Sequence, residues 1–351
     1  MAKKWTKRIM IGLSIPIILI LLIVILLYIP PIQNFLQRKV TAYVSRSTGM
    51  DITIDHVNLR FPLDLVAKDV LIIQSPDTIL SLESLGLKVK LFPLLNGNIE
   101  AHGIFLENAS VNTANMLPAM HLQGDVGRFY LDTRVISLSQ QLVDLETAEL
   151  SDAALFLTMR DTVVVTPEDT LQSSTNWKIT LPNLEVKNVA FTMDTPTDTM
   201  NVTAYIGDGE IKDILADLGA QLYSVENISI NNTRANYDKG NTPPVKGLDY
   251  SHIAVRDVKI EIDSVLYRGN AIRAVIRDFA MTERSGLSIT SISGRLFMDS
   301  VNLMVPVFNL QTPHSEINFR AQSSWNANTP FDISRIEARL NARLGKQDVL
   351  L

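Results

Sequence analysis

The side chains best suited to chemistry are scattered along this sequence and form no familiar catalytic motif. No G-x-S-x-G, P-loop or H-E-x-x-H pattern is present, and no complete G-x-G-x-x-G follows a strand-like run. Cysteine is absent, which excludes disulfides and thiolate metal sites. The histidines stand far apart, so we expect solvated side chains in turns rather than metal ligands. They are His56, His102, His121, His252 and His314. We therefore expect no enzymatic activity, no cofactor and no metal site.

A second polar pattern is Asp followed by Ser or Thr and then by an apolar residue. Its six copies begin at Asp77, Asp161, Asp169, Asp198, Asp263 and Asp299. An Asp side chain can accept a hydrogen bond from the backbone just ahead of it. Each copy therefore predicts a turn that precedes a strand.

From Met50 onward apolar and polar residues alternate, and this period of two predicts β-strands. One eight-residue pattern recurs, with apolar residues at its first, third, sixth and eighth positions and a polar or turn-forming pair in the middle. The middle pairs are Asp55-His56, Lys68-Asp69, His102-Gly103, Ser151-Asp152, Lys187-Asn188, Glu226-Asn227, Arg256-Asp257 and Arg277-Asp278. The pair keeps the apolar side chains on one face through either a two-residue hairpin or a bulge. Each copy thus predicts one apolar face and one solvated face.

The copies are irregularly spaced, so a solenoid of fixed repeat is not supported. Polar runs predict loops over 166–176, 231–246 and 322–330, and Asp208 to Leu218 predicts a short helix. The alternation from Ile333 to Leu351 stops without a terminating signal. We therefore expect the β region, residues 50–351, to be truncated at its C-terminus.

The elements that position this β region lie at the N-terminus. An unbroken apolar run from Ile9 to Ile29 makes a helix of roughly 31 Å, which matches a hydrocarbon core of ~30 Å. The run is too long for a cleavable signal peptide, and no small-residue cleavage site follows it. Basic residues within 1–8 predict a cytoplasmic tail, so residues 30–351 are expected on the far side of the membrane. The sequence thus predicts a single-pass signal anchor over 9–29.

Pro30 and Pro31 break this helix, and apolar residues then recur at helical spacing up to Gly49. This amphipathic helix, 30–49, either caps the following β structure or lies against anionic headgroups. The net charge of −5 argues against a nucleic-acid partner, which would require a basic surface.

The order of basic tail, anchor, amphipathic helix and β array resembles the N-terminal region of AsmA-like envelope proteins, most closely the TamB branch. The resemblance is carried by Gly49, Phe61-Pro62, Lys68-Asp69-Val70, Asp77-Thr78, Pro93-Leu94-Leu95 with Gly97, and the stretch from Ser285 to Thr312. Members of the TamB branch are longer and end in a conserved C-terminal domain that is not found here. Functions of that domain are therefore not carried over. The Asp-Ser/Thr triplets also resemble a periplasmic O-glycosylation pattern. Both interpretations of these triplets, a turn and a glycosylation site, therefore stay open.

The resemblance implies a mainly β fold, an elongated, curved antiparallel β-sheet groove that is apolar inside. It also implies an inner-membrane protein, largely periplasmic, that passes phospholipid acyl chains toward the outer membrane, with an outer-membrane β-barrel as a possible partner. One phase of the alternation supplies the candidate groove lining: Ile52, Ile54, Leu65, Leu87, Val89, Ile99, Ala101, Val186 and Val255. Two alternatives stay open. One is an assembly factor that adds strands of β proteins to its sheet edge, and the other is a structural scaffold with a closed core.

Overall fold

The part of the chain that the computed structural model describes is mainly β. It comprises residues 45, 50–60, 64–74, 76–89, 101–114, 116, 120–137, 140–160, 176–326 and 336–346. Within these ranges lie sixteen strands and one short 3-10 helix, η2 (Pro196–Asp198). No helix among these residues is long and apolar enough to cross a bilayer. The predicted tail (1–8), anchor (9–29) and, apart from Ser45, amphipathic helix (30–49) lie outside the described residues.

The chain divides into two compact units, Met1–Ala109 and Ser110–Leu351. The first unit holds β1 (Asp51–Arg60), β2 (Asp64–Gln74), β3 (Asp77–Val89) and β4 (Ala101–Asn112) as far as Ala109. Neighbouring strands β1, β2 and β3 pair antiparallel. Pro76 lies in a turn before β3, and Gln74 pairs with Asp77.

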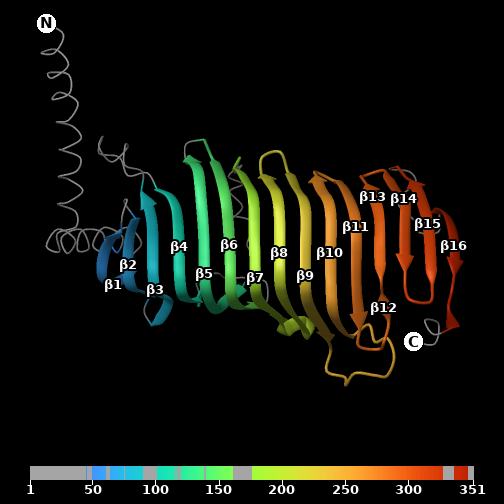
Figure 1. Cartoon of the computed structure of the whole chain (residues 1–351), viewed down its shortest axis with the longest axis horizontal. Helices are drawn as coiled ribbons and strands as arrows, with labels where there is room; N and C mark the ends of the chain where they lie inside the picture. Colours follow the sequence, from blue (N-terminus) through green and yellow to red (C-terminus); the bar gives the residue numbers. More distant parts are fainter. Residues whose placement is uncertain are drawn as a thin grey trace, which may run out of the picture. The chain divides into compact units, whose positions relative to one another are not determined.

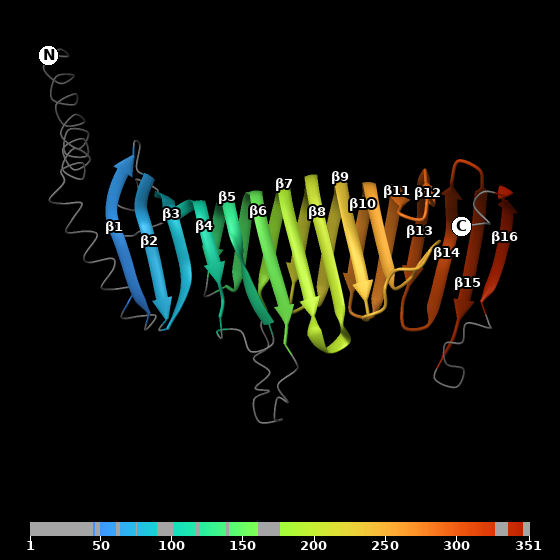
Figure 2. The same ribbon diagram turned by 90° about the horizontal axis from the view of Figure 1, so that it is seen from below.

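The second unit is an open sheet in which the strands follow chain order (Figure 1). Its strands are β5 (Met120–Ser137), β6 (Leu142–Met159), β7 (Lys178–Thr195), β8 (Met200–Asp217), β9 (Leu222–Lys239), β10 (His252–Arg268), β11 (Ala271–Glu283), β12 (Ser288–Ile289), β13 (Ser291–Met298), β14 (Asn302–Gln311), β15 (Glu316–Ser324) and β16 (Glu337–Arg343). The short β12 pairs only with β11. The long strands curve along their length (Figure 2).

The sheet is not wholly antiparallel, which corrects one prediction. β6 and β7 pair in parallel, from Leu142 opposite Lys178 to Thr158 opposite Asp194. A parallel neighbour requires the chain to return along the length of the strand before it pairs again. The residues between these two strands include the polar run 166–176, which we expected to form a simple loop.

Left-handed residues inside continuous strands, not hairpins, explain the recurring sequence pattern. Eight strand-interior Asp and Asn residues have positive φ values between 49° and 55°. They are Asp69, Asn108, Asp152, Asn188, Asp213, Asn227, Asn232 and Asp257. Five of the eight stand at the fifth position of a pattern copy. Asp and Asn enter this left-handed region more easily than other side chains, because their short polar groups can bond locally. The strands continue through these pairs, so the hairpin alternative is wrong for these copies. Register shifts typical of a bulge accompany Asn227 and Asp257. The register runs unbroken past Asp69, Asp152 and Asn188, where the left-handed residue bends the strand without an extra residue.

At six of the eight positions the residue that follows the left-handed residue is buried, because two successive side chains before it point to the other face of the sheet. Lys187 and Asn188 are both exposed, whereas Val189 is 5% exposed. The same step buries Val70, Ala109, Ala153, Thr233 and Val258. Because the solvent face gains one residue at each such position, the strand bends away from it. The apolar face of the sheet is therefore on the inside of the bend.

The same geometry explains why the predicted helix from Asp208 to Leu218 is wrong. This segment belongs mostly to β8. A left-handed Asp213 lies between Ile211 and Ile214, and both pair with apolar residues of β7, Leu184 and Leu181. A strand with a bulge thus reproduces the three-residue apolar spacing of a helix. The predicted loop 231–246 is also partly wrong, because β9 continues to Lys239.

The fully buried core is small. Leu145, Ala148 and Leu181 form one buried cluster in the second unit, against which Leu184 and Ile214 pack. In the first unit Val66 is fully buried, and its side chain points to the face opposite that of its neighbour Leu65. The first unit therefore buries apolar side chains on both faces, which differs from the expected single apolar face.

Candidate functional site

Apolar side chains form continuous rows across the second unit. Directly paired residues share a face of the sheet, so the strand register identifies each row. One row is Phe129, Leu150, Val186, Gly209, Ile230, Ile260 and Phe279. A second row is Leu131, Ala148, Leu184, Ile211, Ile228, Ile262 and Ile276. We call the surface made by these two rows the apolar face.

Most side chains of the apolar face are only half-buried. In the first row every side chain other than glycine keeps partial solvent exposure, and in the second row only Ala148 is buried. Substantial contacts between strands of the described residues are confined to hydrogen-bonded neighbours, so no second layer of strands packs on this face. An apolar surface of this extent that no other described strand covers is typical of a binding site.

Two of the predicted lining residues lie on or beside the apolar face. Val186 belongs to the first row, between Leu150 and Gly209. Val255 pairs with Ala235 of β9 and is half-buried. Gly209 lies opposite Val186, and a Cβ placed on it would make an ordinary van der Waals contact of 3.5 Å with the Val186 Cβ.

The other predicted lining residues belong to the first unit. Leu65 and Leu87 pair directly, whereas Ile52 and Ile54 pair with Ile72 and Val70. All four are half-buried. Val89 lies in β3 and Ala101 in β4, but their side chains are not among those described, and Ile99 lies outside the described residues.

The left-handed Asp and Asn residues are the site-shaping positions that sequence reasoning did not single out. Their signal was the Asp or Asn at the fifth position of the pattern. Two of them face glycine across the sheet. A Cβ on Gly127 would lie 2.9 Å from the Asp152 Cβ, and one on Gly207 would lie 2.7 Å from the Asn232 Cβ. These glycines provide the space that the left-handed residues require.

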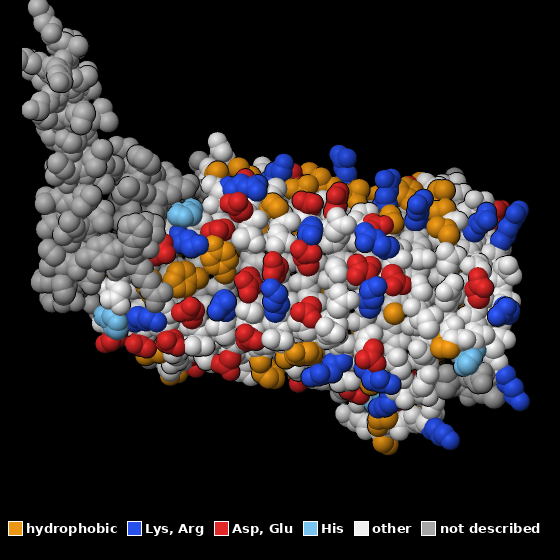
Figure 3. Space-filling model, in the orientation of Figure 1, with side chains coloured by type: hydrophobic (Ala, Val, Ile, Leu, Met, Phe, Trp, Pro, Cys, Tyr) orange, Lys and Arg blue, Asp and Glu red, His pale blue; other side chains and the backbone are white. Residues whose placement is uncertain are grey.

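The opposite face of the second unit carries the charges (Figure 3). Glu185 and Lys187 lie next to Val186 in β7 and form an ion pair of 2.6 Å. The hydrogen bond and charge of Lys187 lower the pKa of Glu185, and Glu185 raises the pKa of Lys187. Asn188 donates its Nδ2 hydrogen to Asp152 Oδ1 at 3.0 Å. A side chain on the apolar face therefore has charged neighbours on the other side of the same strand.

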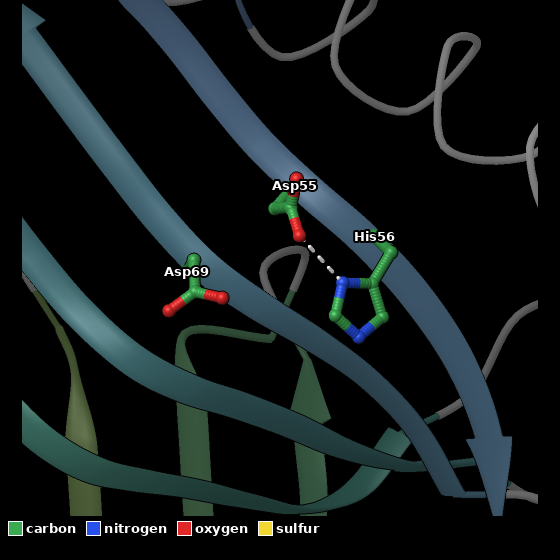
Figure 4. A group of neighbouring side chains, drawn as sticks. All are labelled: Asp55, His56 and Asp69. Atoms are coloured by element: carbon green, nitrogen blue, oxygen red, sulfur yellow. Dashed lines mark hydrogen bonds and ion pairs between the residues drawn. The ribbon is translucent and has the colours of Figure 1, made fainter.

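The histidines do not all behave as expected. His56 is exposed, and in Figure 4 its ring faces Asp55 at 2.8 Å while Asp69 of the next strand lies beside them. Their ligand atoms lie within 4.8 Å of one another, but the three side chains are exposed and Asp55 already pairs with His56. His252 is 5% exposed and pairs with Asp249 at 2.9 Å, so the prediction of a solvated histidine is wrong at this position.

The Asp-Ser/Thr triplets also have more than one structural role. Asp299 forms the predicted turn before β14, because its Oδ1 accepts the backbone N–H groups of Val301 and Asn302 at 2.8 and 2.7 Å. The Val301 hydrogen bond is the main reason that the pKa of Asp299 is lowered. Asp263 instead lies inside β10 and pairs with Arg277, so the turn prediction is wrong there.

Comparison with protein-family models and with curated proteins found no match for this chain.

Proposed function

We propose that this chain is an inner-membrane-anchored periplasmic protein whose apolar face holds phospholipid acyl chains on their way toward the outer membrane. The observation that supports this proposal is the continuity of half-buried rows on a face without a second layer among the described strands. Water would contact these side chains unless an apolar ligand or partner covered them.

The size of the face suits an acyl chain. The first row crosses seven strands, so at about 4.8 Å per strand it extends roughly 29 Å. That length is about twice the ~15 Å half-thickness of a bilayer hydrocarbon core. The rows are bordered on the same strands by charged residues of the opposite face. Acyl chains would thus meet side chains of the rows, while the charged face stays in water.

A photo-crosslinking residue placed in the full-length protein tests this proposal in membranes that contain radiolabelled phospholipid. At Val186 the reactive group would lie on the apolar face, whereas at Glu185 it would lie on the charged face of the same strand. We expect lipid adducts at Val186 and few at Glu185. Equal labelling at the two positions, or none at Val186, would contradict the proposal.

A second candidate function is strand addition, and one observation favours it. All seven residues of β16 are exposed, including Leu340 at 69%, and β16 pairs only with β15 among the described strands. A free edge can accept a strand from a client protein. Protein adducts from a crosslinker at Asn341, together with no lipid adducts at Val186, would favour an assembly factor over a lipid carrier.

A further inference from the structure

Two arginines face each other on the charged side of the sheet, near its C-terminal end. The register of β15 and β16 places Arg320 directly opposite Arg339, and both are exposed. Their side chains alternate with Phe319, Ala321, Ala338 and Leu340, so they point away from those apolar neighbours. They border a hollow of about 610 Å³, which is lined by Met304, Pro306, Arg320, Gln322, Glu337 and Arg339, together with backbone between them.

Neither arginine side chain has an ion-pair or hydrogen-bond partner within the described residues. Other arginines of the charged surface do have one. Arg256 pairs with Asp257 at 2.7 Å, and Arg277 pairs with Asp263. Like charges directly opposite one another in a sheet are destabilising. An anion between the two guanidinium groups would remove this repulsion.

Phosphate fits two converging guanidinium groups well, because each can donate two parallel hydrogen bonds to it. The hollow also contains one carboxylate. Glu337 Oε2 accepts a hydrogen bond from Gln322 Nε2 at 3.0 Å and lies beyond 4.0 Å of both arginine side chains. A ligand with a phosphate and a nearby ammonium would therefore satisfy all three charged groups.

We propose that this hollow binds a phosphoethanolamine group, with the phosphate on Arg320 and Arg339 and the ammonium on Glu337. Met304 is 46% exposed and, with Pro306, gives the hollow an apolar wall against which carbon atoms of the ligand can lie. The same group occurs in free phosphoethanolamine and in the headgroup of a phospholipid. The site lies on the face opposite the apolar rows, so it does not depend on lipid transfer.

Calorimetry with the purified full chain tests the site with three probes: inorganic phosphate, free phosphoethanolamine, and phosphatidylcholine vesicles with and without phosphatidylethanolamine. Binding of free phosphoethanolamine indicates a soluble ligand, whereas binding only to ethanolamine-containing vesicles indicates a lipid headgroup. In either case we expect Arg320→Gln and Arg339→Gln each to weaken binding at least tenfold. Glu337→Gln should remove the preference for phosphoethanolamine over phosphate.

Arg343→Gln is the matched control, because Arg343 lies on the same strand but opposite Glu316 and outside the hollow. Its binding should equal that of the unsubstituted protein. Arg320→Lys tests whether the two parallel hydrogen bonds of a guanidinium group are needed. It keeps the positive charge and should still weaken binding. The proposal is wrong if no probe binds, or if Arg343→Gln weakens binding as much as Arg320→Gln and Arg339→Gln do. Circular dichroism confirms that each variant is folded.

Discussion

Asp and Asn residues in the left-handed conformation bend the strands of this protein. At Asn188 the backbone has φ of 52°, and the side chain bonds Asp152, whose own φ is 55°. The two residues lie on neighbouring parallel strands at the same level of the register. The bends of β6 and β7 therefore coincide, and Ala153 and Val189 are buried together just beyond them.

Substitution of Asn188 should separate backbone strain from loss of the side chain. Asn188→Val places a β-branched residue at positive φ, which we expect to destabilise the protein by about 1–3 kcal/mol. Asn188→Gly relieves the strain and loses only the side-chain hydrogen bonds, which are one to Asp152 and one from the Tyr205 hydroxyl, so its effect should be smaller. Urea unfolding followed by circular dichroism measures both. Thr192→Val, at a position in β7 with ordinary φ, is the control and should change little. Equal losses for Val and Gly at position 188 would argue against strain.

Asp249 gives the loop between β9 and β10 a defined response to acid. Hydrogen bonds from the backbone N–H of Val245, the N–H of Ser251 and the ring of His252 lower the pKa of Asp249 to about 2. An unfolded Asp has a pKa of about 3.9, so the stabilisation is complete above roughly pH 4. It is lost as the pH falls through about 2.

The expected result is a shift of the Val245 amide signal in NMR spectra, with a midpoint near pH 2. Asp249→Asn should remove this transition, because the amide does not titrate. A midpoint near 4 in the unsubstituted protein would mean that the carboxylate is not held by these donors.

Close contacts between strands depend on glycine at particular points of β8. A Cβ at position 207 would lie 2.8 Å from the Asn232 carbonyl oxygen, whereas one at position 209 would meet only ordinary contacts of 3.5 Å or more. Gly207→Ala should therefore destabilise the sheet by about 1–3 kcal/mol. Gly209→Ala should be neutral or stabilising by up to ~1 kcal/mol, because it restricts the unfolded chain. Thermal unfolding of the two variants measures the difference, and equal losses would contradict the bulge geometry.

At the scale of strands, the alternation of apolar and polar residues was enough to predict the β fold. It also predicted that the apolar residues before and after each middle pair share one face of the sheet. It could not distinguish a bulge from a hairpin, because both keep the apolar residues on one face. The sequence pattern also could not predict that β6 and β7 pair in parallel. Residues such as Ala148 and Leu184 alternate with polar residues in the same way in parallel and in antiparallel strands. Asp208 to Leu218 was mistaken for a helix for a related reason, because Asp213 changes the phase within a strand.

The candidate site could be predicted only in part, because the sequence shows which residues alternate along one strand but not which residues of other strands pair with them. Val186 and Val255 could be assigned to the apolar phase from sequence, because side chains alternate along a strand. Their row partners could not, because register between distant strands depends on where each strand begins and where each bulge occurs. The pair Arg320 and Arg339 likewise becomes visible only when β15 and β16 are set in register.

The proposed topology of the whole chain rests on the positive-inside rule and can be tested with one introduced thiol. The chain has no cysteine of its own, and Thr242 is exposed in the loop after β9. Thr242→Cys should react with a membrane-impermeant maleimide added from the periplasmic side of intact inner membranes. Reaction only after those membranes are opened would place the β region in the cytoplasm.

A charge placed on the apolar face distinguishes a lipid-holding surface from a sealed core. Val186 is half-buried opposite Gly209, whereas Val189, three residues later in the same strand, is 5% exposed. An Asp at position 189 would be buried without a partner, so Val189→Asp should cost several kcal/mol and unfold the unit. An Asp at position 186 can keep contact with water when no lipid is bound.

Val186→Asp should therefore leave the protein folded while it removes lipid adducts at neighbouring positions of the row, such as Leu150, because a carboxylate beside acyl chains is unfavourable. Val186→Thr is the matched control, since it is close in size and uncharged, and it should retain adducts. Circular dichroism and adduct yield are measured on the same samples. If Val186→Asp unfolds the protein as Val189→Asp does, the face is sealed and the scaffold interpretation is correct. If Val186→Asp folds and still forms adducts at Leu150, a charge at position 186 does not exclude acyl chains, and the proposed lipid path over Val186 is wrong.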